Sequence, residues 1–179
     1  MYDTALKLIL SLDRHAPAAS LPRALDVLFE RLADPKTGNA QQIEDAIWVM
    51  WTGHSDAAAA QLMERAVAAI AKRQHDIAET HLTRLVEEHP DYAEAWNKRA
   101  TLLFMLKRDA ESVADIERTL ALEPRHFGAI CGFAQICLRA GDRAGALAAF
   151  ETALAINPHM AAVRKAVDEL RDGFSRRVH

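Results

Sequence analysis

The chain has 179 residues and a formal net charge of −3, and its 22 lysines and arginines form no basic stripe of the kind that nucleic-acid binding requires. Half of the residues are hydrophobic and 26% are charged, and no stretch of ~18 apolar residues occurs, so neither a disordered chain nor a membrane span is expected. Seven glycines and six prolines are too few for the many turns of a β-sandwich, so the composition favours an all-α fold.

The first predicted element is a helix over about residues 3–14. Most of its circumference is apolar, through Leu6, Leu8, Ile9, Leu10 and Leu12. A signal peptide is the alternative, but Asp3 stands where positive charge is expected, and Asp13 and Arg14 follow the apolar run. We therefore expect an ordinary amphipathic helix in a cytoplasmic protein, with export as the alternative.

A helical hairpin is predicted next, over about residues 21–53. Its first helix carries leucines at 4-3-4 spacing, namely Leu21, Leu25, Leu28 and Leu32. Residues 34–39 form a turn cluster, and Asn39 with Gln42 resembles a capping box for the second helix. That helix carries Ile43, Ile47, Met50 and Trp51. Residues 1–58 stand outside the repeat described below, and we expect the hairpin to cap the first end of the repeats.

An internal repeat begins after this segment. Pro90, Pro124 and Pro158 follow one another at one constant interval. The same interval superposes columns of small or apolar residues: Leu62, Trp96, Ile130; Ala66, Ala100, Ala134; Ala69, Leu103, Cys137; Ala78, Ser112, Ala146; Leu82, Ile116, Phe150; Leu85, Thr119, Ala153; and Val86, Leu120, Leu154. Each unit is predicted to hold two helices, because each half shows an i, i+3, i+4, i+7 stripe. Asn157-Pro158 ends the last unit, since proline disfavours helical geometry in the residue before it.

These units resemble the tetratricopeptide repeat, a helix–turn–helix of about 34 residues with the pattern W-x2-L-G-x2-Y, A-x3-F, P. Trp96 fills the tryptophan place, alanines replace the glycine, and Phe150 and Pro158 match the second half, whereas Arg99 stands where leucine is usual. The resemblance, which extends to small bacterial proteins of this family, implies a right-handed α-solenoid. Its three units would cover about residues 59–158, with approximate bounds of 59–92, 93–126 and 127–160. A capping helix over about 160–172 and a frayed tail over 173–179 would follow.

The resemblance also implies a function in protein binding, with a peptide or helix lying along a concave groove lined by the first helix of each unit. Carried over, the groove residues are Met63, Val67, Asn97, Thr101, Phe104, Met105, Cys131, Gln135, Leu138 and Arg139. This lining is mostly apolar. The alternative is a structural, self-assembling subunit, for example a homodimer, whose groove is filled by the N-terminal helix of its own chain or of a second copy.

Other functions lack support in the sequence. The carboxylate-clamping subclass of the family uses Lys, Asn and Arg at places that hold Met63, Val67, Lys98, Gly128 and Gly132 here, so binding of acidic chaperone tails is rejected. His75, His81 and His89 lack metal-ligand spacing, and His126 is expected to be a solvated surface residue. Cys131 and Cys137 are expected to be free buried thiols. We therefore expect no enzyme activity, metal or cofactor.

Overall fold

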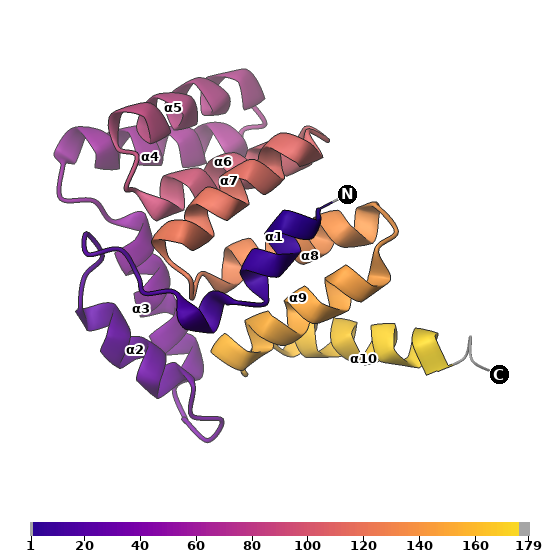
Figure 1. Ribbon diagram of the computed structural model, residues 1–179. Coiled ribbons are helices and arrows are strands. Elements are labelled where there is room, and N and C mark those ends of the chain that lie inside the picture. Colours follow the sequence, from indigo (N-terminus) through magenta and orange to yellow (C-terminus); the bar gives the residue numbers. More distant parts are fainter. Residues whose placement is uncertain (1, 176–179) are drawn as a thin grey trace.

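The computed structural model describes residues 2–175, and within this range the chain is helical, with no strand (Figure 1). The N-terminal part holds α1, a 3-10 turn and two further helices: Asp3–Ile9 (α1), Leu12–Arg14, Ala24–Leu32 (α2) and Ala40–Thr52 (α3). Hairpins follow in the order Ala57–Ala71 (α4), His75–Glu88 (α5), Ala93–Met105 (α6), Asp109–Leu122 (α7), Phe127–Arg139 (α8) and Arg143–Ile156 (α9). Ala161–Ser175 (α10) packs on α9 and closes the array. The predicted all-α solenoid of helical repeats is confirmed.

The turn inside each repeat is built in the same way. Arg73, Lys107 and Gly141 occupy the same place in successive repeats and have the left-handed backbone, with φ of 57°, 62° and 81°. In each case the next residue donates its N–H to a carbonyl five residues back, which satisfies an orphan carbonyl of the first helix. Only the third repeat uses glycine at this position, where a Cβ costs energy.

The polar members of the repeat columns are accommodated inside the fold. The Ser112 hydroxyl, 1% exposed, donates to the Ala100 carbonyl at 2.7 Å, so it replaces a small apolar residue without an unpaired group. Arg99, which stands where leucine is usual, donates to both carboxylate oxygens of Asp115 at 2.7 and 2.8 Å. This bidentate pair joins α6 to α7 in place of an apolar contact.

The apolar core falls into two clusters. One belongs to the first repeat and the beginning of the second, and includes Leu62, Met63, Leu82 and Tyr92. The other joins the second and third repeats to the N-terminal part, and includes Ile9, Leu25, Leu32, Ile43, Ile47, Trp51, Ile116, Phe127 and Phe133. The expectation that the hairpin caps the first end of the repeats is therefore wrong, because its apolar side chains are buried with the second and third repeats.

Residues 2–52, here called the wrapping segment, run along the side of the array. α1 lies between α7 and α9, the second helices of their repeats (Figure 1). The Ala18 N–H then donates to the Leu122 carbonyl at 2.7 Å. The hairpin of α2 and α3 follows the turns that join one repeat to the next: Arg125 pairs with Asp26 at 2.7 Å, and Asn157 donates to Glu44 at 2.9 Å.

Several predicted details of the termini need correction. The expected helix over 3–14 is interrupted after Ile9, and it does not fill the groove of its own chain, because it packs on second helices. Filling of that groove by a second copy stays a prediction. Asn39 makes no side-chain cap and instead accepts from the Thr37 hydroxyl at 3.0 Å. The frayed tail cannot start at 173, since α10 continues to Ser175; residues 176–179 lie outside the described part.

Candidate functional site

One side of the three first helices carries a repeated set of accessible residues. We call this set the open face: Val67, Ile70, Ala71, Thr101, Phe104, Met105, Gln135, Leu138 and Arg139. Its members recur at the interval of the repeat, so equivalent residues of α4, α6 and α8 share one orientation. Val67 and Met105 are 41% and 46% exposed, which is unusual for large apolar side chains. The open face is thus a mostly apolar, solvent-accessible surface that extends across three repeats.

The charged member of the open face has its charge balanced. The Arg139 guanidinium lies 3.7 Å from the centroid of the Phe104 ring and donates to the Phe104 carbonyl at 3.0 Å. It also donates to both carboxylate oxygens of Asp109, through Nε at 2.9 Å and through Nη2. Because these partners hold Arg139 in place, it contributes planar, neutralised surface rather than a free positive charge.

One turn earlier on the same helices, the predicted groove residues are covered. Met63 is 1% exposed and Asn97 is 6% exposed, while Cys131 is half-buried. Burial, with a smaller effect of Glu44, raises the pKa of the Cys131 thiol to about 12, so it is a poor nucleophile. Of the ten predicted groove residues, seven belong to the open face: Val67, Thr101, Phe104, Met105, Gln135, Leu138 and Arg139.

On α6 and α8, the cover over the N-terminal part of this face comes from α3. Trp48 packs so closely on Gly128 that a Cβ there would lie 2.6 Å from Cη2 of the indole. The Lys98 ammonium sits 5.6 Å from the centroid of the Trp48 ring. Glu44, one turn before Trp48, accepts from the indole N–H at 3.4 Å. The wrapping segment therefore closes the N-terminal ends of α6 and α8 and leaves their C-terminal ends accessible.

Beneath α3 lies a buried polar cluster around Glu94. Its carboxylate accepts from Asn97 Nδ2, lies 2.9 Å from His126 Nε2, and pairs with Lys98 at 2.9 Å. His126 Nδ1 accepts the Ala129 N–H at 3.1 Å, so Nε2 carries the proton that is donated to Glu94. Burial alone would raise the pKa of Glu94, but His126 and Lys98 more than offset it and hold this pKa below its ordinary value.

His126 corrects the sequence prediction of a solvated histidine. It is 0% exposed, and its ring stacks on Trp51 with the centroids 4.0 Å apart and the planes 8° from parallel. The sequence offered one signal that another element packs here. Gly128 is a poor helix former in the first turn of α8, which indicates a close approach by another element. It could not indicate that the approaching element was α3.

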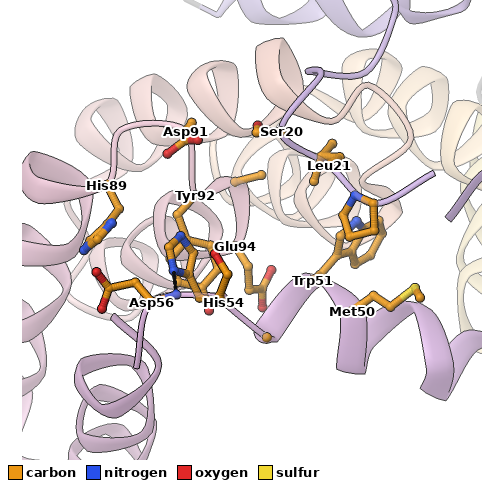
Figure 2. Close-up of a pocket in the computed structure, with 14 residues that line it drawn as sticks. Ser20, Leu21, Met50, Trp51, His54, Asp56, His89, Asp91, Tyr92 and Glu94 are labelled. Atoms are coloured by element: carbon orange, nitrogen blue, oxygen red, sulfur yellow. Dashed lines mark hydrogen bonds between the residues drawn. The ribbon is translucent and has the colours of Figure 1, made fainter. Parts of the chain in front are cut away.

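A cleft of about 480 Å³ opens where the wrapping segment meets the turn between the first two repeats (Figure 2). In Figure 2, His54 and Tyr92 lie together on one side of it, with Trp51 and Met50 on the other. The Tyr92 hydroxyl donates to the Thr52 carbonyl, and Asp56 caps α4 through the N–H groups of Ala58 and Ala59. These polar groups therefore serve the local structure of the α3–α4 connection.

Among residues 2–175, no group of three or more histidine, cysteine, aspartate or glutamate side chains is placed to hold a metal ion. No helix within the described range is long and apolar enough to cross a membrane. The accessible feature that recurs through the repeats is the open face.

Comparison with known proteins agrees with this fold. The family model for the tetratricopeptide repeat matches residues 63–127. A TPR repeat-containing protein of the bacterium Rhizobium etli is 38% identical over 143 residues, which is 79% of this chain and 70% of the relative.

Three solved structures show the same architecture at low sequence identity. The first TPR domain of Spaghetti (RPAP3), bound to the HSP90 peptide SRMEEVD, is 19% identical with a TM-score of 0.62. The match covers 68% of this chain and 98% of the Spaghetti domain. The TPR2B domain of yeast Sti1, in complex with an Hsp70 peptide, is 18% identical with a TM-score of 0.58, over 64% of this chain and 97% of its own. A MamA protein is 14% identical with a TM-score of 0.60, over 98% of this chain and 85% of its own. With this fold and a bacterial relative of such identity, the chain belongs to the tetratricopeptide repeat family.

Proposed function

We propose that the chain is a protein-interaction module whose open face binds an apolar peptide or helix of a partner protein. The observation that carries this proposal is the recurrence of accessible apolar side chains at equivalent places in three repeats, Val67, Phe104, Met105 and Leu138 among them. Residues that recur with the repeat on stacked helices suit an elongated ligand that crosses all three. Methionine adapts its shape to different apolar partners.

The solved relatives support a binding role rather than catalysis. The Spaghetti and Sti1 domains hold peptides of HSP90 and Hsp70 on the same fold. The first-helix face of our chain would bind a peptide of different chemistry. Met63 is buried, Lys98 is paired with Glu94, and Gly128 lies under Trp48. The partner is therefore an apolar segment, and a carboxylate-terminated tail is not its recognition element.

The test is affinity capture from the native host with quantitative mass spectrometry. The Val67→Glu, Met105→Glu double variant places two carboxylates on the open face and should lose the specific prey at least tenfold, since each buried charge would oppose an apolar ligand. Met63 is unsuitable for this purpose, because at 1% exposure a glutamate there would disrupt the core.

A matched control makes the same chemical change elsewhere. Val27 on α2 and Ile77 on α5 are 56% and 48% exposed and lie outside the open face. The Val27→Glu, Ile77→Glu variant should retain the prey of the natural chain. Equal prey recovery from both double variants would disprove binding through the open face.

A further inference from the structure

The groove between α7 and α9 is the seat of α1. Ala5, Ile9 and Leu12 of the wrapping segment are 2%, 1% and 6% exposed. They share one apolar cluster with residues of the second helices, Val113, Ile116, Leu120, Ala149 and Ala153. Tyr2 adds an edge-to-face contact with Phe133, with the ring centroids 6.3 Å apart. This seat is an apolar surface that requires an occupant, because such patches are rarely left open on a protein surface.

The occupant holds its shape only through that seat. α1 has 7 residues, and no side chain caps its N-terminus. Helices shorter than ~12 residues are marginal in water, so α1 is helical while docked and unfolded when released. By contrast, α2 and α3 bury Leu25, Leu32, Ile47 and Trp51 at 2% exposure or less and are also pinned by Arg125 and Asn157. Within the wrapping segment, α1 is the part that can leave while the hairpin stays.

The connection between these two parts is long and loosely held. Residues 10–23 lie between α1 and α2, and Leu12 is the one buried side chain among them. A backbone bond from Ala18 to Leu122 ties this connector to the end of α7. The eleven residues 13–23, which follow the docked Leu12, can reach about 36 Å when extended. The connector can therefore deliver α1 to a neighbouring molecule.

We propose that α1 is exchanged between two copies of this chain, so that each copy seats its α1 between α7 and α9 of the other. A second copy is the occupant that the seat fits, since it reproduces each cluster contact and the Tyr2–Phe133 contact that α1 makes within one chain. Exchange of an identical element is a low-cost route to a dimer. The balance between the closed monomer and the exchanged dimer is then set by the connector, which determines the effective concentration of α1 at its own seat.

The experiment shortens this connector in the full chain by deleting residues 15–19. Docking within one chain becomes strained, whereas docking between chains remains possible, so the dimer dissociation constant should fall by about 100-fold or more. Sedimentation velocity and native mass spectrometry measure it, and circular dichroism checks that helix content is retained. Adding Ile9→Asp to the shortened chain prevents α1 from docking between α7 and α9 of its own chain or of the second copy. The shortened chain should then return to a monomer. A folded, shortened chain that stays monomeric at all concentrations overturns the proposal.

A second measurement uses the unaltered chain, in case the shortened one does not fold. Copies labelled with ¹⁴N and ¹⁵N are mixed at high concentration, warmed and examined by native mass spectrometry. Dimers of mixed mass that disappear in Ile9→Asp but persist in the Val67→Glu, Met105→Glu variant are expected. Absence of any dimer, or a dimer unaffected by Ile9→Asp, overturns the proposal; loss in the double variant instead assigns the contact to the open face.

Discussion

At the scale of single residues, two glycines of α8 have opposite surroundings. A Cβ on Gly128 would lie 2.6 Å from the Trp48 ring, whereas a Cβ on Gly132 would lie 3.8 Å from the Ile116 side chain, an ordinary contact. Gly128→Ala must push α3 away and should lower the free energy of unfolding by about 1–3 kcal/mol. Gly132→Ala should raise it by about 0.5–1 kcal/mol, because glycine is a poor helix former. Urea unfolding of both variants measures the difference, and destabilisation of the same size in both would show that Trp48 is not responsible.

Glu94 provides a prediction about pH. Its pKa lies below its ordinary value of 4.5 in the folded chain, so its ionisation stabilises the fold above about pH 4.5, and this contribution is lost as the pH falls through the lower, folded-state pKa. Glu94→Gln removes this contribution. The natural chain should therefore be more stable than the variant at pH 7, and the gap should shrink below pH 4.5. The other carboxyl groups contribute equally to the free energy of unfolding of both proteins, so their contributions cancel in the difference. A difference in this free energy that stays constant from pH 7 to pH 3 would contradict the assignment.

The cysteines should be inert in the folded protein. Burial raises the pKa of Cys131 to about 12 and that of Cys137 to about 11, with smaller contributions from Glu44 and Asp142. Since the thiolate is the reactive form, alkylation by iodoacetamide at pH 8 should be about 100-fold slower or more than in the urea-unfolded chain. Mass spectrometry of the time course measures both rates, and rapid labelling of Cys131 in the native protein would contradict the burial that α3 imposes.

At the scale of elements, the role of α1 can be tested against its immediate neighbour. Ile9 is 1% exposed and faces the α7–α9 seat, whereas Leu10 is 58% exposed. Ile9→Asp should release α1, increase the binding of an apolar dye and lower stability by about 3 kcal/mol, since a charge would replace buried aliphatic surface. Deletion of residues 1–14 should have the same effect. Leu10→Asp should leave dye fluorescence and stability nearly unchanged, and equal effects of the two point variants would argue against the observed register of α1.

The helices of the repeats illustrate what a local pattern can predict. Apolar residues recur with the helical period, and turn residues recur with the period of the repeat, so both the number and the approximate ends of these helices follow from the sequence. The left-handed residues Arg73 and Lys107 were not predictable in this way. Neither is a residue that favours such a backbone, and the conformation is imposed by the hydrogen bonds that close the turn.

At the scale of the whole molecule, the wrapping segment covers part of the first helices α6 and α8 through Trp48. The peptide SRMEEVD is bound by the Spaghetti domain. Our chain should not bind it, because Lys98 is paired with Glu94 and Gly128 lies under Trp48. Fluorescence anisotropy with the labelled peptide, with the Spaghetti domain as the positive control, should show no saturable binding up to about 100-fold above the control midpoint. Saturable binding at concentrations similar to the control would contradict the covered face.

The candidate site was predicted in part. The sequence placed ten residues on the first-helix face, and seven of them belong to the open face because a strict repeat gives equivalent positions the same orientation. Met63, Asn97 and Cys131 follow the same periodicity, yet their surroundings differ. Met63 is buried in the apolar cluster of the first repeat, Asn97 donates to the buried Glu94, and Cys131 packs against the cluster that includes α3. The cover over Cys131 includes an element outside the repeat, whose position no repeat pattern can report.

By itself, the sequence determined the all-α fold, three repeated hairpins and the residues that form each apolar stripe, because these depend on periodicity within a short stretch of chain. The tertiary structure alone decided the path of the wrapping segment, the burial of His126 and the half of the face that stays accessible. These features depend on contacts between distant positions: Arg125 with Asp26, Asn157 with Glu44 and His159 with Leu32 are 99, 113 and 127 residues apart. Such contacts leave no local period, since each joins a segment outside the repeat to one particular turn of it.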